Sequence, residues 1–529
     1  MGIKRYTANK DNTITNSFKQ NLRTRGTGSN MGASDIVEVF SIYGQNFATG
    51  TYSGQESQEI SRGLFQFPVS GSSKGQIKYD RTNGIIPASG SVDFYLRLYN
   101  AKHSQTLPRN ATYMVQAVSQ SWSEGNGLDM DEYKDEDVSN WVYRKDNDKW
   151  GKIGGEYHSA SYHTSVNRFP TYTTTLANGD EDIELNITSM VEEWLSGPLD
   201  NFGLSIRLTG SQEAYFSSSN GLDVEPTILS NLAGAKKSYY TKKFFARGTQ
   251  YFFKRPVIEA RWDSSNKDDR GRAFFSSSLA PSADNLNTLY LYNFINGQLT
   301  NIPEVGTGVV YMEAYSGSAD NSEPSTQLIQ FATGTMMKTE KFYVTGGHHE
   351  TGIYTASFAL TASSTNLLSK VFDVWTAGSG SNKQYFTGSF TITKRNGSET
   401  NISPKYVTKI TNLKSSYKTD ETPKLRLYCR PYDWSPTIYS KASTAIENTI
   451  IDDAYYKVYR IYDNETAIQY GTGSDNLNYT RLSYDVSGNY FDLTMNLLEA
   501  DAMYAIRLSY YINGEYREQP EIFKFRVEK

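Results

Sequence analysis

Apolar and polar residues alternate along most of this chain. In the segment 204–208 the apolar positions are Leu204, Ile206 and Leu208, with a polar residue between each pair. A period of two sends successive side chains to opposite faces of a β-strand, so this pattern predicts a strand with one buried face. The same alternation recurs at 94–99, 354–360, 386–392, 425–428 and 506–510.

Turn signals separate these runs. Clusters of Gly, Asn, Asp and Ser lie between the alternating segments, which is typical of β-sandwiches. The dipeptide Asn-Gly favours the positive φ angles of tight hairpins. It occurs at Asn83-Gly84, Asn296-Gly297, Asn396-Gly397 and Asn513-Gly514. The segment 512–516 predicts the clearest hairpin, because strand-like residues flank its turn on both sides.

One segment has the period of a helix instead. Its apolar residues follow the spacing i, i+3, i+4, i+7, i+8 and are Ile187, Met190, Val191, Trp194 and Leu195. Ser189 and Glu192 have the spacing of a capping box, and Gly197-Pro198 ends the segment. We expect a short amphipathic helix packed on a sheet, with Trp194 in the core rather than in a ligand site.

The patterns together predict an all-β chain with several β-sandwich domains, jelly-roll or Ig-like, in series and one short amphipathic helix in the first. Composition places a first sandwich at 1–235 and further sandwiches at 285–410 and 411–529. The charged and aromatic segment 236–284 is expected to be an irregular connector. We also expect this connector, or a neighbouring subunit, to cover sheet edges, because unpaired edges promote aggregation.

Composition narrows the function classes. Among 529 residues there are 40 Tyr and 25 Phe, and the net charge is −4. The Tyr excess suits either half-buried strands or wet protein–protein interfaces, and the sequence leaves both open. No basic stripe is present, so nucleic acid is not expected as the main ligand. Lys236-Lys237 and Lys242-Lys243, interleaved with aromatic residues, are expected to be solvated lysines of the connector.

The thiol content and the N-terminus predict the site of synthesis. Cys429 is the only cysteine, so no intrachain disulfide can form, and folding in a reducing cytoplasm is expected. The first residues lack the apolar segment of a secretory signal. No apolar run reaches the roughly 18 residues of a membrane-spanning helix. We therefore expect a chain made in the cytoplasm, without signal peptide or membrane partner.

Catalytic signatures are weak. The five histidines are His103, His158, His163, His348 and His349. His348-His349-Glu350 does not have the His-Glu-x-x-His spacing of zinc sites. Gly71-Ser72-Ser73-Lys74-Gly75 has the letters of a nucleophile elbow, but its surroundings indicate a polar loop between strands. We predict no catalytic residue, no cofactor and no enzymatic activity.

An acidic cluster is the best candidate for a metal site. It comprises Asp129, Asp131, Glu132, Asp135, Glu136 and Asp137. Calcium binds several oxygen ligands from flexible loops, but the spacing differs from that of an EF-hand and the glycine of its sharp turn is missing. A solvated acidic loop is the favoured interpretation. Calcium binding at Asp129–Asp137 remains the alternative.

The first part of the chain resembles the β-sandwich family called DNRLRE, which occurs in cell-surface and phage structural proteins. The matching motifs, in chain order, are Ser121-Trp122-Ser123-Glu124-Gly125-Asn126-Gly127, Asn140-Trp141, Trp150 with Gly154-Gly155, the helical segment 185–198, Asn201-Phe202-Gly203 before the strand 204–208, Phe216-Ser217-Ser218-Ser219, and Glu225-Pro226. The helical segment is the most specific of them. This family brings no catalytic residues to transfer.

The whole chain is similar, more weakly, to virion structural proteins of marine tailed bacteriophages. The segments that carry this likeness are 29–35, 255–262 and 518–528. The resemblance implies a structural virion component, such as a decoration, neck, tail-adaptor or fibre protein, that binds other virion proteins in a symmetric multimer. A host-surface glycan adhesin is the alternative. A polysaccharide depolymerase is a third reading, but its two carboxyls, roughly 5–10 Å apart, cannot be found in one β-rich sequence.

Overall fold

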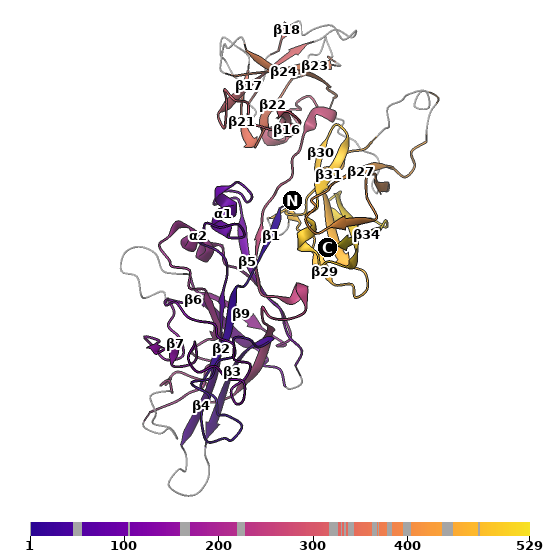
Figure 1. Ribbon diagram of the computed structural model, residues 1–529. Helices are drawn as coiled ribbons and strands as arrows, with labels where there is room; N and C mark the ends of the chain where they lie inside the picture. Colours follow the sequence, from indigo (N-terminus) through magenta and orange to yellow (C-terminus); the bar gives the residue numbers. More distant parts are fainter. Residues whose placement is uncertain are drawn as a thin grey trace. The chain divides into compact units, whose positions relative to one another are not determined.

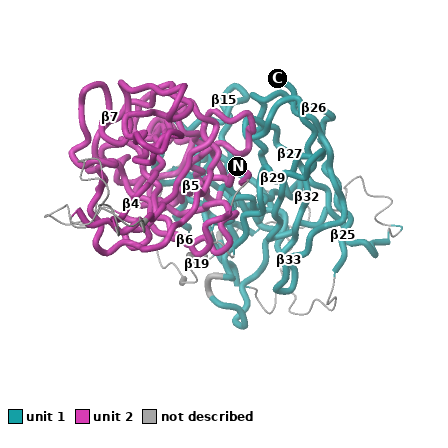
Figure 2. Tube along the Cα trace, turned by 90° about the horizontal axis from the view of Figure 1, so that it is seen from below, with its two compact units in different colours: residues 1, 264–529 teal, residues 2–263 magenta. Residues whose placement is uncertain are grey.

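A computed structural model describes residues 2–45, 55–103, 106–158, 170–218, 228–316, 326–328, 331–332, 335–336, 343–361, 368, 370–377, 383–394, 404–435, 438, 448–473 and 477–529. The fold is nearly all β, as predicted (Figure 1). The chain divides into two compact units, residues 2–263 and residues 264–529 together with residue 1 (Figure 2).

The first unit is a sandwich of two sheets. One sheet has the order β1 (Ile3–Thr7), β13 (Val257–Arg261), β5 (Asp93–Leu98) and β10 (Ile183–Asn186). The other has the order β12 (Tyr239–Phe245), β3 (Ile36–Gln45), β4 (Glu56–Gln66), β11 (Leu204–Leu208), β6 (Ala111–Ala117) and β9 (Tyr172–Leu176), with β2 (Lys10–Thr15) also beside β4. A small hairpin, β7 (Tyr143–Lys145) and β8 (Asp148–Lys149), stands apart from both.

The core of this unit lies between the two sheets. It contains the alternating apolar residues of 94–98 and 204–208, as their pattern predicts. Helix α2 (Thr188–Ser196) packs Met190, Val191 and Trp194 into the same core. It ends at Gly197, whose φ of 97° is left-handed. The helix and the core position of Trp194 were thus predicted correctly.

Two local details differ from the sequence prediction. Ile187, not Ser189, is the N-cap of α2, and no side chain caps it. The segment 71–75 precedes a second helix, α1 (Ile77–Thr82), instead of joining two strands. Only Ile77 and Asp80 are buried in α1, so its short sequence carries too weak an apolar period to reveal it.

The segment 236–284 is less irregular than its composition suggests. It supplies β12 to one sheet of the first unit and β13 to the other. Phe244 and Ile258 lie in the core, while the neighbouring charged residue Glu259 is buried in ion pairs with Arg5 and Arg261. The arginine partners compensate the buried carboxylate and hold its pKa low, at about 2, against the opposing effect of burial. The compact unit therefore extends to Asp263, beyond the predicted boundary at 235.

The second unit begins with one curved sheet. Its order is β14 (Asn287–Tyr292), β22 (Ile353–Phe358), β21 (Val344–Glu350), β17 (Val309–Ser316), β23 (Lys370–Thr376) and β24 (Gln384–Thr391), with β18 (Thr326–Gln327) beside β17. Two short pairs accompany it, β15 (Phe294–Ile295) with β16 (Gln298–Leu299) and β19 (Phe331–Ala332) with β20 (Thr335–Met336). We call this part, with its core, the middle domain. Asn296 and Gly297 both have positive φ at the predicted hairpin between β15 and β16.

The rest of the unit is a sandwich, the C-terminal domain. One sheet has the order β25 (Tyr406–Ile410), β27 (Lys424–Pro431), β31 (Gly488–Asp492) and β30 (Ser483–Asp485). The other has the order β26 (Ser416–Lys418), β34 (Phe523–Glu528), β32 (Ala502–Ile512), β28 (Ala454–Arg460) and β29 (Thr466–Ile468), with β33 (Glu515–Glu518) beside β32. Tyr456 and Phe491 stack at 4.4 Å between ring centroids and join the sheets. The predicted hairpin at Asn513-Gly514 connects β32 and β33.

Short 3-10 turns complete the described part of the chain. They are η1 (Phe252–Lys254), η2 (Asp269–Gly271), η3 (Ser282–Asn285) and η5 (Met495–Leu497). Among the residues described, no helix has the length and apolar character needed to cross a membrane.

Candidate functional site: a strap and the cleft beside it

Residues 264–276, which we call the strap, run from the C-terminal domain to the middle domain. The first half pairs in parallel with the edge strand β30. The backbone N–H of Asp268 donates to the carbonyl of Tyr484 at 3.1 Å, and the N–H of Tyr484 donates to the carbonyl of Asn266 at 2.9 Å. The strap therefore covers an edge of the C-terminal domain that would otherwise be open.

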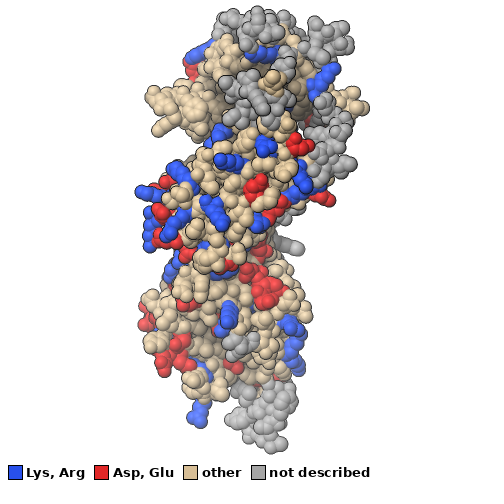
Figure 3. All heavy atoms as spheres, turned by 90° about the vertical axis from the view of Figure 1, so that its right-hand side faces the viewer, with Lys and Arg blue, Asp and Glu red and all other residues tan. Residues whose placement is uncertain are grey.

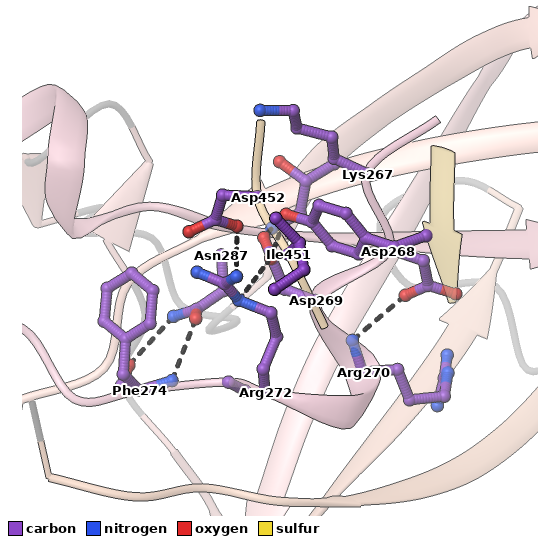
Figure 4. Close-up of polar contacts among 12 residues, drawn as sticks. Lys267, Asp268, Asp269, Arg270, Arg272, Phe274, Asn287, Ile451 and Asp452 are labelled. Atoms are coloured by element: carbon purple, nitrogen blue, oxygen red, sulfur yellow. Dashed lines mark hydrogen bonds and ion pairs between the residues drawn. The ribbon is translucent and has the colours of Figure 1, made fainter. Parts of the chain in front are cut away.

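The second half of the strap closes the curved sheet of the middle domain. The N–H of Phe275 donates to the carbonyl of Thr393 at 2.9 Å, and the N–H of Ser276 donates to the carbonyl of Leu360 at 2.8 Å. The side-chain amide of Asn287 takes the place of a backbone group, because it accepts from the N–H and donates to the carbonyl of Phe274, both at 2.9 Å (Figure 4). Ala273 and Phe275 are buried in the middle-domain core.

A single carboxylate of the strap binds both domains. Asp269 accepts a hydrogen bond from the Tyr484 hydroxyl at 2.9 Å and another from the backbone N–H of Thr288, in β14, at 2.8 Å. Burial raises the pKa of Asp269. Burial also raises the pKa of the neighbouring Asp268 to about 6. The junction therefore holds two acids whose ionised forms are disfavoured by desolvation.

Two arginines that follow Asp269 reinforce the junction, each through an ion pair with one of the two domains. Arg270 binds the carboxylate of Asp373 through two hydrogen bonds of 2.6 Å, and Asp373, which is fully buried, also accepts from the indole N–H of Trp375 at 2.7 Å. Arg272 pairs with Asp452 of the C-terminal domain (Figure 4). Arg270 and Arg272 thus bind one domain each, and the bidentate geometry of the Arg270 pair favours a fixed orientation.

A cleft of about 420 Å³ lies beside the strap, within this unit. Its size falls within the range of small-molecule binding sites. The lining residues are Ser264, Asn266, Tyr292, Phe294, Leu299, Glu350, Ile353, Lys424, Arg426, Ser483, Asp485, Tyr490 and Asp492. They come from the strap, the middle domain and the C-terminal domain.

The C-terminal domain supplies a polar wall. In β27 and β31, Lys424 stands opposite Asp492 and Arg426 stands opposite Tyr490. The ammonium of Lys424 lies 4.4 Å from the centroid of the Tyr490 ring. Arg426 also binds Asp485 of β30 through hydrogen bonds of 3.0 and 2.8 Å. Neighbouring strands therefore place charged groups and one aromatic ring in a fixed row on one face of the sheet.

The middle domain supplies an apolar wall. Phe294 and Leu299 face each other across the β15–β16 hairpin, and Phe294 is 60% exposed. Tyr292 hydrogen-bonds to Tyr490 of the opposite wall. The carbonyl of Gly352, at the turn before β22, accepts from the N–H of Asn293 at 2.8 Å, which fixes the base of the hairpin.

The sequence-predicted candidates lie elsewhere or have structural partners. His348 contacts the side chain of Asn301 at 3.1 Å, and His349 contacts that of Asn266, in the strap, at 2.8 Å. His103 contacts Asn100 at 3.1 Å. His158 lies in the loop after β8, and His163 lies outside the described residues. Ser73 of the segment 71–75 is exposed in the loop before α1.

The acidic loop turns on itself. One oxygen of Asp129 accepts from the N–H groups of Asp131, Glu132 and Tyr133 at 2.8, 2.8 and 3.2 Å, and these bonds lower the pKa of Asp129. Glu136 pairs with Lys134 at 2.6 Å. Within the described ranges, no three His, Cys, Asp or Glu residues are grouped so that they could hold a metal ion.

Whereas Trp194 belongs to the main core, three tryptophans from the motifs of the first unit lie together in a second, smaller core. Trp122, Trp141 and Trp150 pack there with Ile14, Ile60, Leu64 and Val118. Beside them, Arg62 forms a buried ion pair with Glu213 at 2.7 Å and donates to the carbonyl of Gly154 at 2.7 Å. Glu225-Pro226 lies outside the described residues.

Charge on the face drawn in Figure 3 does not indicate a site. Basic and acidic side chains are interspersed over this face. The charged composition of 236–284 marks the segment that contains the strap, but it does not reveal the cleft. Its two walls come from strands at least 71 residues apart, from Ile353 to Lys424, and single-sequence patterns do not reveal which strands become neighbours.

Comparisons with known proteins identify no family. No protein-family model and no curated protein matches the chain. Among solved structures it is similar to the N-terminal Ig1-2 module of Drosophila receptor protein tyrosine phosphatase DLAR, at 8% identity, covering 46% of this chain and 91% of that chain with a TM-score of 0.13. A titin structure gives 7% identity, covers 50% and 95% of the two chains, and has a TM-score of 0.14.

A third similar structure is trypsin-activated alpha-2-macroglobulin from Escherichia coli. It is 9% identical, covers 80% of this chain and 29% of that chain, and has a TM-score of 0.16. Similarities this low carry no functional argument. The all-β assignment rests on the sheets themselves.

Proposed function

We propose that this chain is a non-enzymatic structural component of a tailed-bacteriophage virion that acts through protein–protein interfaces. The observation that carries the proposal is the strap. It joins the middle and C-terminal domains through backbone pairing, the Asp269 carboxylate and two arginine ion pairs. A junction fastened in this way favours a rigid block over a hinge that opens and closes around a substrate.

The exposed side chains support a role in contacts. Among the described residues, nine large apolar side chains are at least 60% exposed and so are accessible to a protein partner. They are Leu22, Tyr133, Leu232, Leu279, Phe294, Tyr432, Ile438, Tyr462 and Val486. They occur on both compact units, so contacts with neighbouring virion proteins can involve each unit.

The sequence likeness to DNRLRE domains and to tailed-phage virion proteins supplies the finer part of the proposal. This likeness suggests a tailed-phage virion as the particle, whereas the strap supports only the structural role. A decoration, neck, tail-adaptor or fibre position, in several symmetry-related copies, is consistent with rigid β-domains in series.

Particle analysis tests this proposal directly. Purified virions that carry the coding sequence should contain the chain at a fixed copy number by quantitative mass spectrometry. Cross-links should join its exposed side chains, such as Tyr432 and Tyr462 and their neighbours, to other virion proteins. A chain present in infected cells but absent from purified particles would refute the virion role.

Glycan binding is the second candidate function, and the cleft is the observation that favours it. An adhesin and a structural component are compatible, since a particle protein can also carry a binding site. Depolymerase activity has no comparable support. We expect no release of reducing ends when the protein is incubated with polysaccharide of the host surface.

A further inference from the structure

We propose that the cleft beside the strap binds a neutral oligosaccharide, built of hexose or N-acetylhexosamine units. This inference does not depend on the structural role; it rests on the glycan-binding candidate and names the class of sugar that the cleft takes. Three properties carry it: a row of polar groups on one wall, an exposed aromatic ring on the other, and a junction that holds the two walls in place.

The polar wall presents donors and acceptors in pairs. Lys424 and Asp492 lie opposite each other in register, so an ammonium donor and a carboxylate acceptor are side by side. Ser483 and Tyr490 form the next pair along the sheet, in β30 and β31, but their hydroxyls are already bonded, that of Ser483 to the Asn266 N–H and that of Tyr490 to Tyr292. Lys424 and Asp492 are therefore the pair offered to a ligand. A hydroxyl group both donates and accepts hydrogen bonds, so neighbouring hydroxyls of a sugar ring match such a mixed pair.

The opposite wall presents an apolar surface. The Phe294 ring is 60% exposed on the β15–β16 hairpin, with Leu299 directly across from it. The hydrogen-bearing face of a sugar ring is apolar and packs against aromatic rings, whose faces carry partial negative charge. A sugar in the cleft would therefore place its C–H face toward Phe294 and its hydroxyls toward the polar wall.

The charges of the cleft argue for a neutral ligand. The lining contains two basic residues, Lys424 and Arg426, and three acidic residues, Glu350, Asp485 and Asp492. Arg426 and Asp485 already neutralise each other through two hydrogen bonds. The remaining groups, one ammonium and two carboxylates, disfavour uronic acids, sulfated sugars and phosphates, because an anion would face a net negative site.

The strap makes the cleft rigid before any ligand arrives. Asn266 forms part of the lining, and its backbone N–H donates to the Ser483 hydroxyl at 2.9 Å. Its side chain contacts His349, next to Glu350, at 2.8 Å. Both walls are therefore held relative to the strap, and a site that is already ordered loses less entropy when it binds a flexible ligand.

The test uses the full chain on an array of neutral, amino-sugar and uronic-acid oligosaccharides, followed by titration calorimetry with the best-bound sugar. We expect neutral hexose or N-acetylhexosamine oligomers to bind and uronic-acid oligomers not to bind. Hydrogen exchange should slow in the peptides that contain Lys424 and Tyr490 when this sugar is added.

Two variants and one control locate the site. Phe294→Ala removes an exposed ring, and Asp492→Asn keeps the shape of the side chain while removing its charge. Each should weaken binding about tenfold, since the lost contact is worth about 1.4 kcal/mol. Tyr432→Ala is the matched control, because Tyr432 is 68% exposed but lies outside the cleft lining, and it should bind as the unaltered protein does.

Three results would overturn the proposal: no array sugar binds at millimolar concentration, only anionic sugars bind, or the two cleft variants bind as well as Tyr432→Ala. Calorimetric unfolding of each variant shows whether it folds, and the exchange measurement on the unaltered protein locates the site without any substitution. Absence of the chain from virions would refute the structural role and leave this test unaffected.

Discussion

Replacement of Asp269 by alanine should uncouple the middle and C-terminal domains. The carboxylate accepts the Tyr484 hydroxyl at 2.9 Å and the Thr288 N–H at 2.8 Å, one from each domain. Alanine leaves both buried donors without this acceptor. A lost hydrogen bond of this kind costs about 1–1.5 kcal/mol, so the two together should lower the free energy of unfolding by about 2–3 kcal/mol.

Asparagine at the same position separates the hydrogen bonds from the charge. Its side-chain oxygen can accept from Thr288, and its side-chain N–H can donate to the Tyr484 oxygen. We therefore expect Asp269→Asn to cost less than about 1 kcal/mol. Because the pKa of Asp269 is raised by burial, removal of its charge also removes an unfavourable desolvation.

Calorimetry and hydrogen exchange measure the effect in the full chain. Asp269→Ala should lower the unfolding temperature and speed exchange in peptides from both β14 and β30, whereas Asp269→Asn should change neither much. Equal destabilisation by the two variants would show that the charge, not the hydrogen bonds, joins the domains. If alanine left exchange in β14 and β30 unaltered, the bridging role would be refuted.

Three further predictions follow from local geometry. Burial raises the pKa of Asp268 from 3.8 to about 6, so the folded state binds its proton more tightly than the unfolded state, and this group's contribution to stability falls as pH rises from about 4 to above 6. Asp268→Asn should therefore raise the free energy of unfolding at pH 7.5, by up to about 3 kcal/mol. Denaturant titrations should show this gain shrinking toward pH 5. A gain that does not change with pH would contradict the prediction. Gly203 has a φ of +89°, and an added Cβ would lie 2.1 Å from the carbonyl oxygen of Phe65. Gly203→Ala should therefore lower the free energy of unfolding by more than about 2 kcal/mol in the same titration. Gly210→Ala is the control and should lower it little, because there is open space around Gly210. Limited proteolysis of the isolated protein should spare the strap, because its backbone is paired on both domains, and early cleavage within it would count against that pairing.

The strands were predictable because their signal is local. Alternation placed Leu204, Ile206 and Leu208 on a buried face, and Asn513-Gly514 marked a hairpin that the structure contains. Helix α2 was equally local, since its apolar stripe lies within one short segment. In each case the residues that form the sequence pattern are also the ones that lie in the strand, hairpin or helix.

The strap and cleft were not predictable, because their contacts join residues that are far apart in the sequence. The charged composition of 236–284 suggests solvent exposure, yet Arg270 is paired with Asp373, 103 residues away. Lys242 is similarly misleading: its ammonium is buried and donates to Asn100 and to the carbonyls of Gly179 and Glu181. A charge that is compensated by a distant partner looks the same in the sequence as one in water.

The two-ended pairing of the strap has a consequence for synthesis on the ribosome. Its second half can join the middle domain once residues up to Thr393 have emerged, but its first half must await Tyr484, the partner of Asp269 215 positions later. During that interval residues 264–269 form an unpaired extended segment, which any complementary strand edge of a nascent neighbour could capture. Slowed translation between these points should therefore increase aggregation of the newly made chain, and faster completion should protect it.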